Sequence, residues 1–140
     1  MKPGISVITL AVEDLQRSLN FYRDGMHLET EGIVGEKYEY GKVVFIPMQP
    51  GLQLALWPKT SLAKDTGLPI TPHCATQTLI SHNVRFKDAV DEVMEQARAA
   101  GATIIKEAQD TFWGGYAGYF QDPDQHLWEI VFNSKLMPLE

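Results

Sequence analysis

Short apolar runs with the two-residue period of a β-strand alternate along this chain with two stretches that have the period of a helix. In the first half, the expected strands are rich in β-branched or alternating apolar residues and cover 5–12, 28–34, 43–48 and 52–57. A helix is expected after the first strand, because Asp14 can cap it and Leu15 and Leu19 recur on one face. This half therefore predicts a strand–helix–strand–strand–strand module.

The same order of elements returns after residue 75. The pattern predicts a strand at 76–84, a helix at 86–100, a short strand at 103–105 and two closing strands at 116–120 and 126–132. Leu54-Ala55-Leu56 and Trp128-Glu129-Ile130 occupy matching places in the two halves. Each module can bury one sheet face against its helix, and the other face must also be covered. We therefore predict an α+β fold of two tandem βαβββ modules with curved mixed sheets enclosing a cleft.

The segment between the modules, 58–74, holds three prolines and shows no periodicity. At about sixteen residues it is long for a connection in a compact domain, so we interpret it as a crossing linker or a lid. The expected domain is 1–140, with one repeat at 1–57, a second at 75–134 and linker 58–74 between them.

Composition and charge exclude several functions. The formal net charge is −6 and only 12 Lys and Arg residues are spread along the chain, which argues against nucleic-acid binding. The single cysteine, Cys74, excludes an internal disulfide and a Cys-rich zinc site. No apolar run approaches membrane-spanning length, and the chain enters its first strand at Ile5 with no signal-peptide pattern. We therefore expect a cytoplasmic protein that binds neither nucleic acid nor membrane.

The last strand carries the main candidate for chemistry. Trp128 and Ile130 share one of its faces. Glu129 projects from the other face, between Leu127 and Val131. A carboxylate on an apolar face needs a partner, a metal or a proton, so Glu129 is the candidate general base or ligand anchor. The alternative is a carboxylate paired with Lys or Arg, or solvated at a rim.

Further candidates lie on the same predicted strand faces or in the aromatic segment before the last turn. The expected ligand-binding residues are Gln53, Trp57, Ser81, Asn83, Trp113 and Tyr116. Aromatic rings with a few polar anchors make a good small-molecule pocket. The alternative for Trp57 and Trp113 is ordinary packing in a core or a dimer interface, where Trp is also favoured.

Two motifs resemble a known family. The residues VEDLQRSLNFY at 12–22 and GYFQDPDQHLWE at 118–129 resemble the opening and closing signatures of the vicinal oxygen chelate superfamily. This superfamily includes glyoxalases, extradiol dioxygenases, fosfomycin-modifying enzymes and bleomycin-resistance proteins. One departure is Gln125, which stands where the family usually has Gly. The turn there must hold a non-Gly residue at positive φ or change its type.

The resemblance implies paired modules that form a cleft, often in a homodimer. It also places the ligands of metal-using members on four strands, at the positions of Val7, Ala55, Leu79 and Glu129. Only Glu129 can bind a metal there, whereas a divalent ion needs three or more N or O donors. We therefore expect no metal cofactor, and a divalent metal bound through an unusual ligand set is the disfavoured alternative.

These observations leave two function classes. The first is a metal-independent protein, of the glyoxalase or bleomycin-resistance kind, that binds an apolar or aromatic small molecule. The alternative is an enzyme of lyase or oxygenase type that uses Glu129 as base or metal ligand, with Ser81, Asn83 or Gln53 polarising an oxygen of the substrate.

Overall fold

The structure is a computed structural model that describes residues 1–135. The chain divides into two compact units, Met1–Pro72 and a second that begins at His73. The first unit contains β1 (Val7–Val12), α1 (Leu15–Leu19), the π-helix η1 (Asn20–Gly25), β2 (Ile33–Val34), β3 (Val43–Pro47), β4 (Gln53–Pro58) and α2 (Lys59–Thr66). The second contains β5 (Leu79–Val84), α3 (Lys87–Ala99), β6 (Thr103–Asp110), β7 (Tyr116–Gln121) and β8 (Leu127–Phe132).

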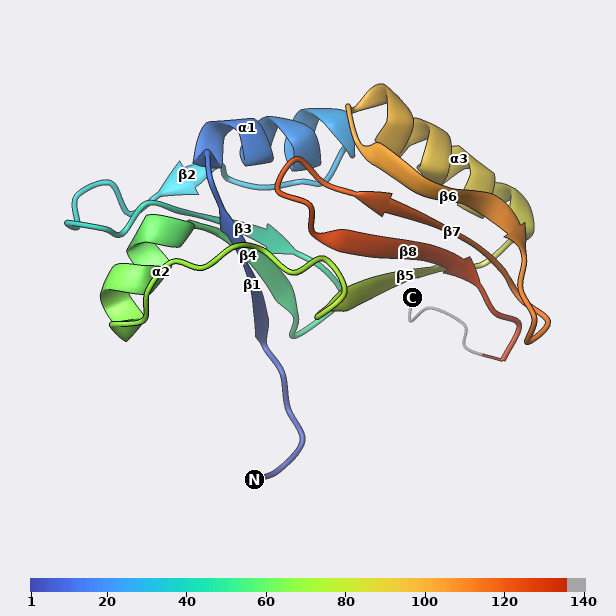
Figure 1. The fold of residues 1–140 in the computed structure, drawn as a ribbon, viewed down its shortest axis with the longest axis horizontal. Coiled ribbons are helices and arrows are strands. Elements are labelled where there is room, and N and C mark those ends of the chain that lie inside the picture. Colours follow the sequence, from blue (N-terminus) through green and yellow to red (C-terminus); the bar gives the residue numbers. More distant parts are fainter. Residues whose placement is uncertain (136–140) are drawn as a thin grey trace. The chain divides into compact units, whose positions relative to one another are not determined.

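Each unit holds one four-stranded mixed sheet, and the two sheets have the same topology. The strand orders are β1-β4-β3-β2 and β5-β8-β7-β6. In each sheet the first strand pairs parallel with the last, and the remaining pairs are antiparallel. Figure 1 shows both sheets as curved and open rather than closed into barrels. The prediction of an α+β fold built from two tandem modules is therefore confirmed.

The core of the first unit follows from the alternation along its strands. Every second strand residue is buried toward α1: Leu10, Val12, Val44, Ile46, Leu54 and Leu56. The helix begins as predicted, because the side chain of Asp14 accepts a hydrogen bond from the backbone N–H of Arg17 at 3.1 Å. It continues into η1, which ends at Gly25, and Tyr22 is buried there.

In the second unit, α3 lies across one face of the sheet (Figure 1) and buries Val90, Met94 and Ala97. Gly118 of β7 lies on this face. A Cβ at Gly118 would lie 2.9 Å from Met94 Cε and 3.0 Å from Met94 Sδ. The missing side chain therefore lets the helix approach the strand closely.

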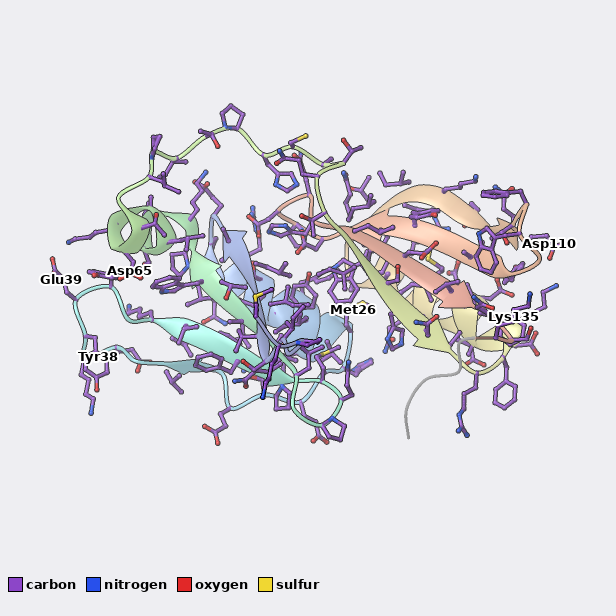
Figure 2. The ribbon with its side chains drawn as sticks, turned by 90° about the horizontal axis from the view of Figure 1, so that it is seen from below. Met26, Tyr38, Glu39, Asp65, Asp110 and Lys135 are labelled. Atoms are coloured by element: carbon purple, nitrogen blue, oxygen red, sulfur yellow. The ribbon has the colours of Figure 1, made fainter. Side chains whose placement is uncertain are left out.

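The segment 58–74, interpreted above as a linker without periodicity, contains a helix that this interpretation missed. Pro58 precedes α2 and Gly67 follows it with φ of 77°, so these helix breakers mark its two ends. The helix is tied to the loop before β3, because Lys64 pairs with Glu39. Figure 2 labels Glu39 on this loop and Asp65 on the helix. Only the part after Gly67 has no regular secondary structure before β5.

Three predicted strands differ from the observed ones by three or more residues at one end. The strand expected at 28–34 is only Ile33–Val34, and the strand expected at 76–84 begins at Leu79. The strand expected at 103–105 extends to Asp110 as β6, which pairs with β7 through two register shifts. The β-bulges that cause such shifts leave no simple alternation to detect in the sequence.

The turn between β7 and β8 holds Gln125 at φ of 68°, as one of the two alternatives for this position predicted. Asp122 is buried, and its carboxylate accepts the backbone N–H groups of Asp124 and His126, each at 2.9 Å. The turn is therefore held by its own Asp side chain.

Among residues 1–135, no helix combines the length and the apolar character that crossing a bilayer requires.

Candidate functional site

Three residues on neighbouring strands of the second sheet form a polar row on the face opposite α3. Gly118 and its cross-strand partner Ile130 lie on the face toward the helix, so their sequence neighbours Tyr119 and Glu129 lie on the opposite face. Ser81 of β5 lies beside Glu129 of β8, and Tyr119 of β7 lies on the other side of Glu129. The register thus places one carboxylate between two hydroxyl groups.

Both hydroxyl groups donate hydrogen bonds to Glu129. Ser81 Oγ lies 2.7 Å from Glu129 Oε1, and Tyr119 OH lies 2.9 Å from Glu129 Oε2. Within residues 1–135, no Lys, Arg or His forms an ion pair with Glu129. The carboxylate is therefore held by neutral donors, not by a cation.

The electrostatics of this row keep Tyr119 protonated. Burial raises the pKa of the Tyr119 phenol, and the hydrogen bond to Glu129 and the charge of that carboxylate raise it further. Tyr119 therefore remains a donor at neutral pH. A carboxylate has about four lone-pair sites, and the two hydroxyls occupy two of them. The remaining sites can accept hydrogen bonds from a ligand.

The surroundings of the polar row are apolar. Leu79 flanks Ser81 along β5, and Leu127 and Val131 flank Glu129 along β8. Asn83 lies two residues beyond Ser81 on the same face and is half-buried. This face can therefore contact an apolar body while Glu129 binds a polar group.

The other predicted site residues lie elsewhere. The phenol of Tyr116 donates to Asp91 Oδ1 of α3 at 2.7 Å, on the helix side of the sheet. Trp113 lies in the turn between β6 and β7 with its ring over Gly115, and is 42% exposed. The structure therefore brings Ser81 to Glu129 but does not bring Tyr116 there.

Gln53 and Trp57 belong to the first unit, on the face of its sheet opposite α1. The indole N–H of Trp57 donates to the carbonyl oxygen of Tyr40 at 3.2 Å. Gln53 lines a cavity of about 560 Å³, together with Phe45 and Pro47 of the neighbouring strand. The first unit therefore has its own concave surface, formed without Glu129.

Sequence reasoning did not select Tyr119 as a site residue, although it contacts Glu129 directly. Tyr119 stood out only as one of several aromatic residues around the last hairpin. Its place beside Glu129 depends on the register of that hairpin, in which Gln121 pairs with Leu127. Counting two residues back from Gln121 and two residues forward from Leu127 would have paired Tyr119 with Glu129.

The donors do not fit the divalent metal that the resemblance implies. Val7, Ala55 and Leu79 present only hydrocarbon side chains at the implied positions. Among residues 1–135, no group of three or more His, Cys, Asp and Glu side chains is placed to hold an ion. Glu129 alone, with two hydroxyl partners, is too small a donor set for Zn²⁺ or a similar ion.

Comparison with known proteins agrees with this fold. Residues 4–130 match the family model of the Glyoxalase/Bleomycin resistance protein/Dioxygenase superfamily, and the chain belongs to this superfamily. It is 28% identical, over 93% of its length and 90% of the relative's, to the fosfomycin resistance protein FosX of Listeria monocytogenes.

Solved structures share the fold over nearly the whole chain. A glyoxalase-related enzyme from Fulvimarina pelagi superposes with a TM-score of 0.78 at 34% identity, covering 92% of this chain and 87% of that one. FosX from Listeria monocytogenes superposes with a TM-score of 0.68 at 26% identity, covering 95% of each chain. The resemblance found in the two sequence motifs is therefore confirmed.

Proposed function

We propose that this chain binds a small molecule, without a metal, on the sheet face around Glu129. The ligand has an apolar or aromatic body and carries an O–H or N–H donor. The observation that carries this proposal is the state of Glu129, which two neutral hydroxyls hold and which no cation among residues 1–135 neutralises. The names of two relatives, a fosfomycin resistance protein and a glyoxalase-related enzyme, also support a small-molecule role.

The physical argument starts from the unused acceptor sites of Glu129. A hydrogen bond to an ionised carboxylate contributes about 1.5–3 kcal/mol, more than one between neutral groups. The hydroxyls of Ser81 and Tyr119 fix the carboxylate, so a ligand meets a preorganised acceptor. Leu79, which is 44% exposed, then supplies apolar contact beside it.

The second candidate function is an enzyme of lyase or oxygenase type, in which Glu129 acts as base on an acidic C–H bond or on water. The contact with Tyr119 favours it, because a phenol with a raised pKa keeps its proton beside the same carboxylate. Such a pair can take up one proton and donate another. We also propose that the protein is cytoplasmic and that it forms a homodimer, the latter because the resemblance implies it.

Two measurements test the proposal. Calorimetric titration with Ni²⁺, Zn²⁺, Fe²⁺ and Mn²⁺ should show no specific one-to-one binding. A panel of aromatic alcohols and amines, observed by NMR, should shift the signals of residues around Glu129, and Glu129→Leu should abolish those shifts. Glu92→Gln, an exposed carboxylate on α3, is the matched control and should bind as the wild type does.

Specific outcomes would contradict the proposal or select between its two forms. Tight metal binding that is lost in Glu129→Gln would overturn the metal-independent function. Unchanged ligand shifts in Glu129→Leu would exclude this face as the site. Chemical turnover of a bound ligand, abolished by Glu129→Gln while binding persists, would establish the enzymatic alternative.

A further inference from the structure

The cavity of the first unit has an apolar floor built from its sheet. Val34, Phe45 and Pro47 line it, and their cross-strand partners place them on the face opposite α1. Phe45 is 39% exposed, a large accessible area for an aromatic ring. A volume of about 560 Å³ is within the range of small-molecule pockets, so this surface can take a ligand of modest size.

One polar side chain is available on this floor. Gln53 lines the cavity, and its amide has no hydrogen-bond partner among residues 1–135. Thr30 also lines the cavity, but its hydroxyl donates to the carbonyl oxygen of Phe45 at 2.5 Å and accepts the N–H of Gly32 at 3.2 Å. Thr30 therefore shapes the wall, and Gln53 is the group that can bind a ligand.

The rim of the cavity is acidic. Glu29 and Glu31 line it from the segment before β2, and neither carboxylate has an ion-pair or hydrogen-bond partner in residues 1–135. Arg23 of η1 is a basic side chain that approaches Gly32, but its guanidinium is bonded to Asp24 at 2.9 Å. The residues that line the cavity include no basic side chain, so its charge is negative.

We propose that this cavity binds an organic cation, an ammonium group attached to an aromatic or other apolar body. Two uncompensated carboxylates attract the cation, and the face of Phe45 adds a cation–π contact. The carbonyl oxygen of Gln53 can accept a hydrogen bond from the ammonium N–H. The same charges repel carboxylates and phosphates. The proposal uses residues of the first unit only and goes beyond the function proposed for Glu129.

Three probes of nearly equal size test the charge preference: benzylamine, which is protonated at pH 7, benzyl alcohol and benzoate. Their dissociation constants are measured by NMR from the shifts of the Gln53 side-chain amide and the backbone of Gly32. At about 10 mM salt, benzylamine should bind about tenfold more tightly than benzyl alcohol, and benzoate should not bind. At about 300 mM salt, screening should reduce the preference for benzylamine to about two- to threefold.

Variants assign the preference to the two carboxylates. Glu29→Gln and Glu31→Gln should each weaken benzylamine binding about threefold at low salt, and the double variant should bind benzylamine and benzyl alcohol equally. Benzyl alcohol binding should not change in these variants. Glu92→Gln removes the same charge from α3 of the second unit and should leave every constant unchanged.

Each contrary result overturns a defined part of the argument. Equal binding of benzylamine and benzyl alcohol to the wild type would overturn the cation preference and leave only an apolar pocket. Absence of shifts with all three probes would overturn the cavity as a site. Neither result would affect ligand binding at Glu129, because that function is measured separately with Glu129→Leu.

Discussion

The sheets of the two units have the same topology. Their side chains differ along a row of three residues on the face opposite the helix. In the second unit the row is Ser81, Glu129 and Tyr119, on three neighbouring strands. At the matching register positions of the first unit stand Thr9, Ala55 and Phe45. The β-hydroxyl residue is present in both rows, but the first unit has Ala for Glu and Phe for Tyr.

The carboxylate and the phenol are both present in the second row and both absent from the first. The phenolic hydroxyl of Tyr119 binds Glu129, and the matching Phe45 stands beside an alanine that needs no donor. Polar side chains of the first unit instead line its cavity, with Gln53 on the floor and Glu29 and Glu31 at the rim. The same backbone thus carries two different surfaces, because side chains and not topology decide what each face can bind.

The largest expected effect comes from building the carboxylate into the first row. Ala55 is 3% exposed, so Ala55→Glu buries a charge that has only the Thr9 hydroxyl beside it, and it should destabilise the protein by about 3 kcal/mol or more in urea unfolding. Adding Phe45→Tyr supplies the phenol that the second row has and should recover about 1 kcal/mol. If Ala55→Glu and the double variant with Phe45→Tyr were equally stable, a phenol at position 45 would not stabilise a carboxylate at position 55 as Tyr119 is expected to stabilise Glu129.

A second substitution tests how the helices pack. Gly118 corresponds by register to Val44 of the first unit, and a Cβ there would meet Met94 Cε at 2.9 Å. Gly118→Val should therefore cost about 1–3 kcal/mol in unfolding free energy. Combining it with Met94→Ala makes room, so the double-mutant cycle should show a favourable coupling of about 1 kcal/mol. Additive effects would mean that Met94 does not set the spacing.

A smaller effect is expected from the hydroxyls of the two rows. Ser81→Ala removes a 2.7 Å hydrogen bond to Glu129 and should lower the unfolding free energy by about 0.5–1 kcal/mol. Thr9→Ala, the matched change in the first row, lies beside Ala55 and removes no such bond. Ligand affinity at Glu129 should fall in Ser81→Ala and stay constant in Thr9→Ala. Equal loss of affinity in both would contradict the assignment of the site.

The smallest expected signal is in the titration of Tyr119. Its folded pKa lies above the value of about 10 for a free tyrosine, because of burial and the bond to Glu129. The unfolded chain therefore releases this proton first as the pH rises. The stability contributed by Tyr119 is complete below about pH 10 and is lost as the pH rises through the folded pKa.

This titration can be followed by the ¹³Cζ shift of labelled tyrosine, with Tyr119→Phe to assign the signal. Glu129→Gln should move the pKa of Tyr119 back toward its ordinary value, since one of its causes is removed. The control is Tyr116, whose pKa is raised through its hydrogen bond to Asp91 and should not respond to Glu129→Gln. A Tyr119 that titrates at the ordinary value would contradict the proposed contact.

Much of the fold could be predicted because its signals are local. The alternation in β4 and β8 predicted both strands, and Asp14 predicted the start of α1. Strand parity also placed Ser81 among the candidates to assist Glu129. The helix α2 was missed, because Pro58 and Gly67 were interpreted as signs of an irregular linker, whereas they mark the two ends of the helix.

The cavity of the first unit could not be predicted in the same way. The sequence favoured a strand at 28–34, but only Ile33–Val34 pairs with β3. Gly32 has φ of 86°, and Thr30 bonds to the carbonyl oxygen of Phe45, so the chain leaves the sheet there. That departure places Glu29 and Glu31 at the cavity rim.

Local periodicity and two motifs were enough to predict the modules, the superfamily and the carboxylate at 129. Which side chains meet that carboxylate depended on strand register, which turn geometry and packing set between residues far apart in sequence. Tyr119 and Ser81 are 10 and 48 residues from Glu129, yet both donate to it. Periodicity assigns a residue to a face of a strand, whereas its neighbours on that face come from pairing with other strands.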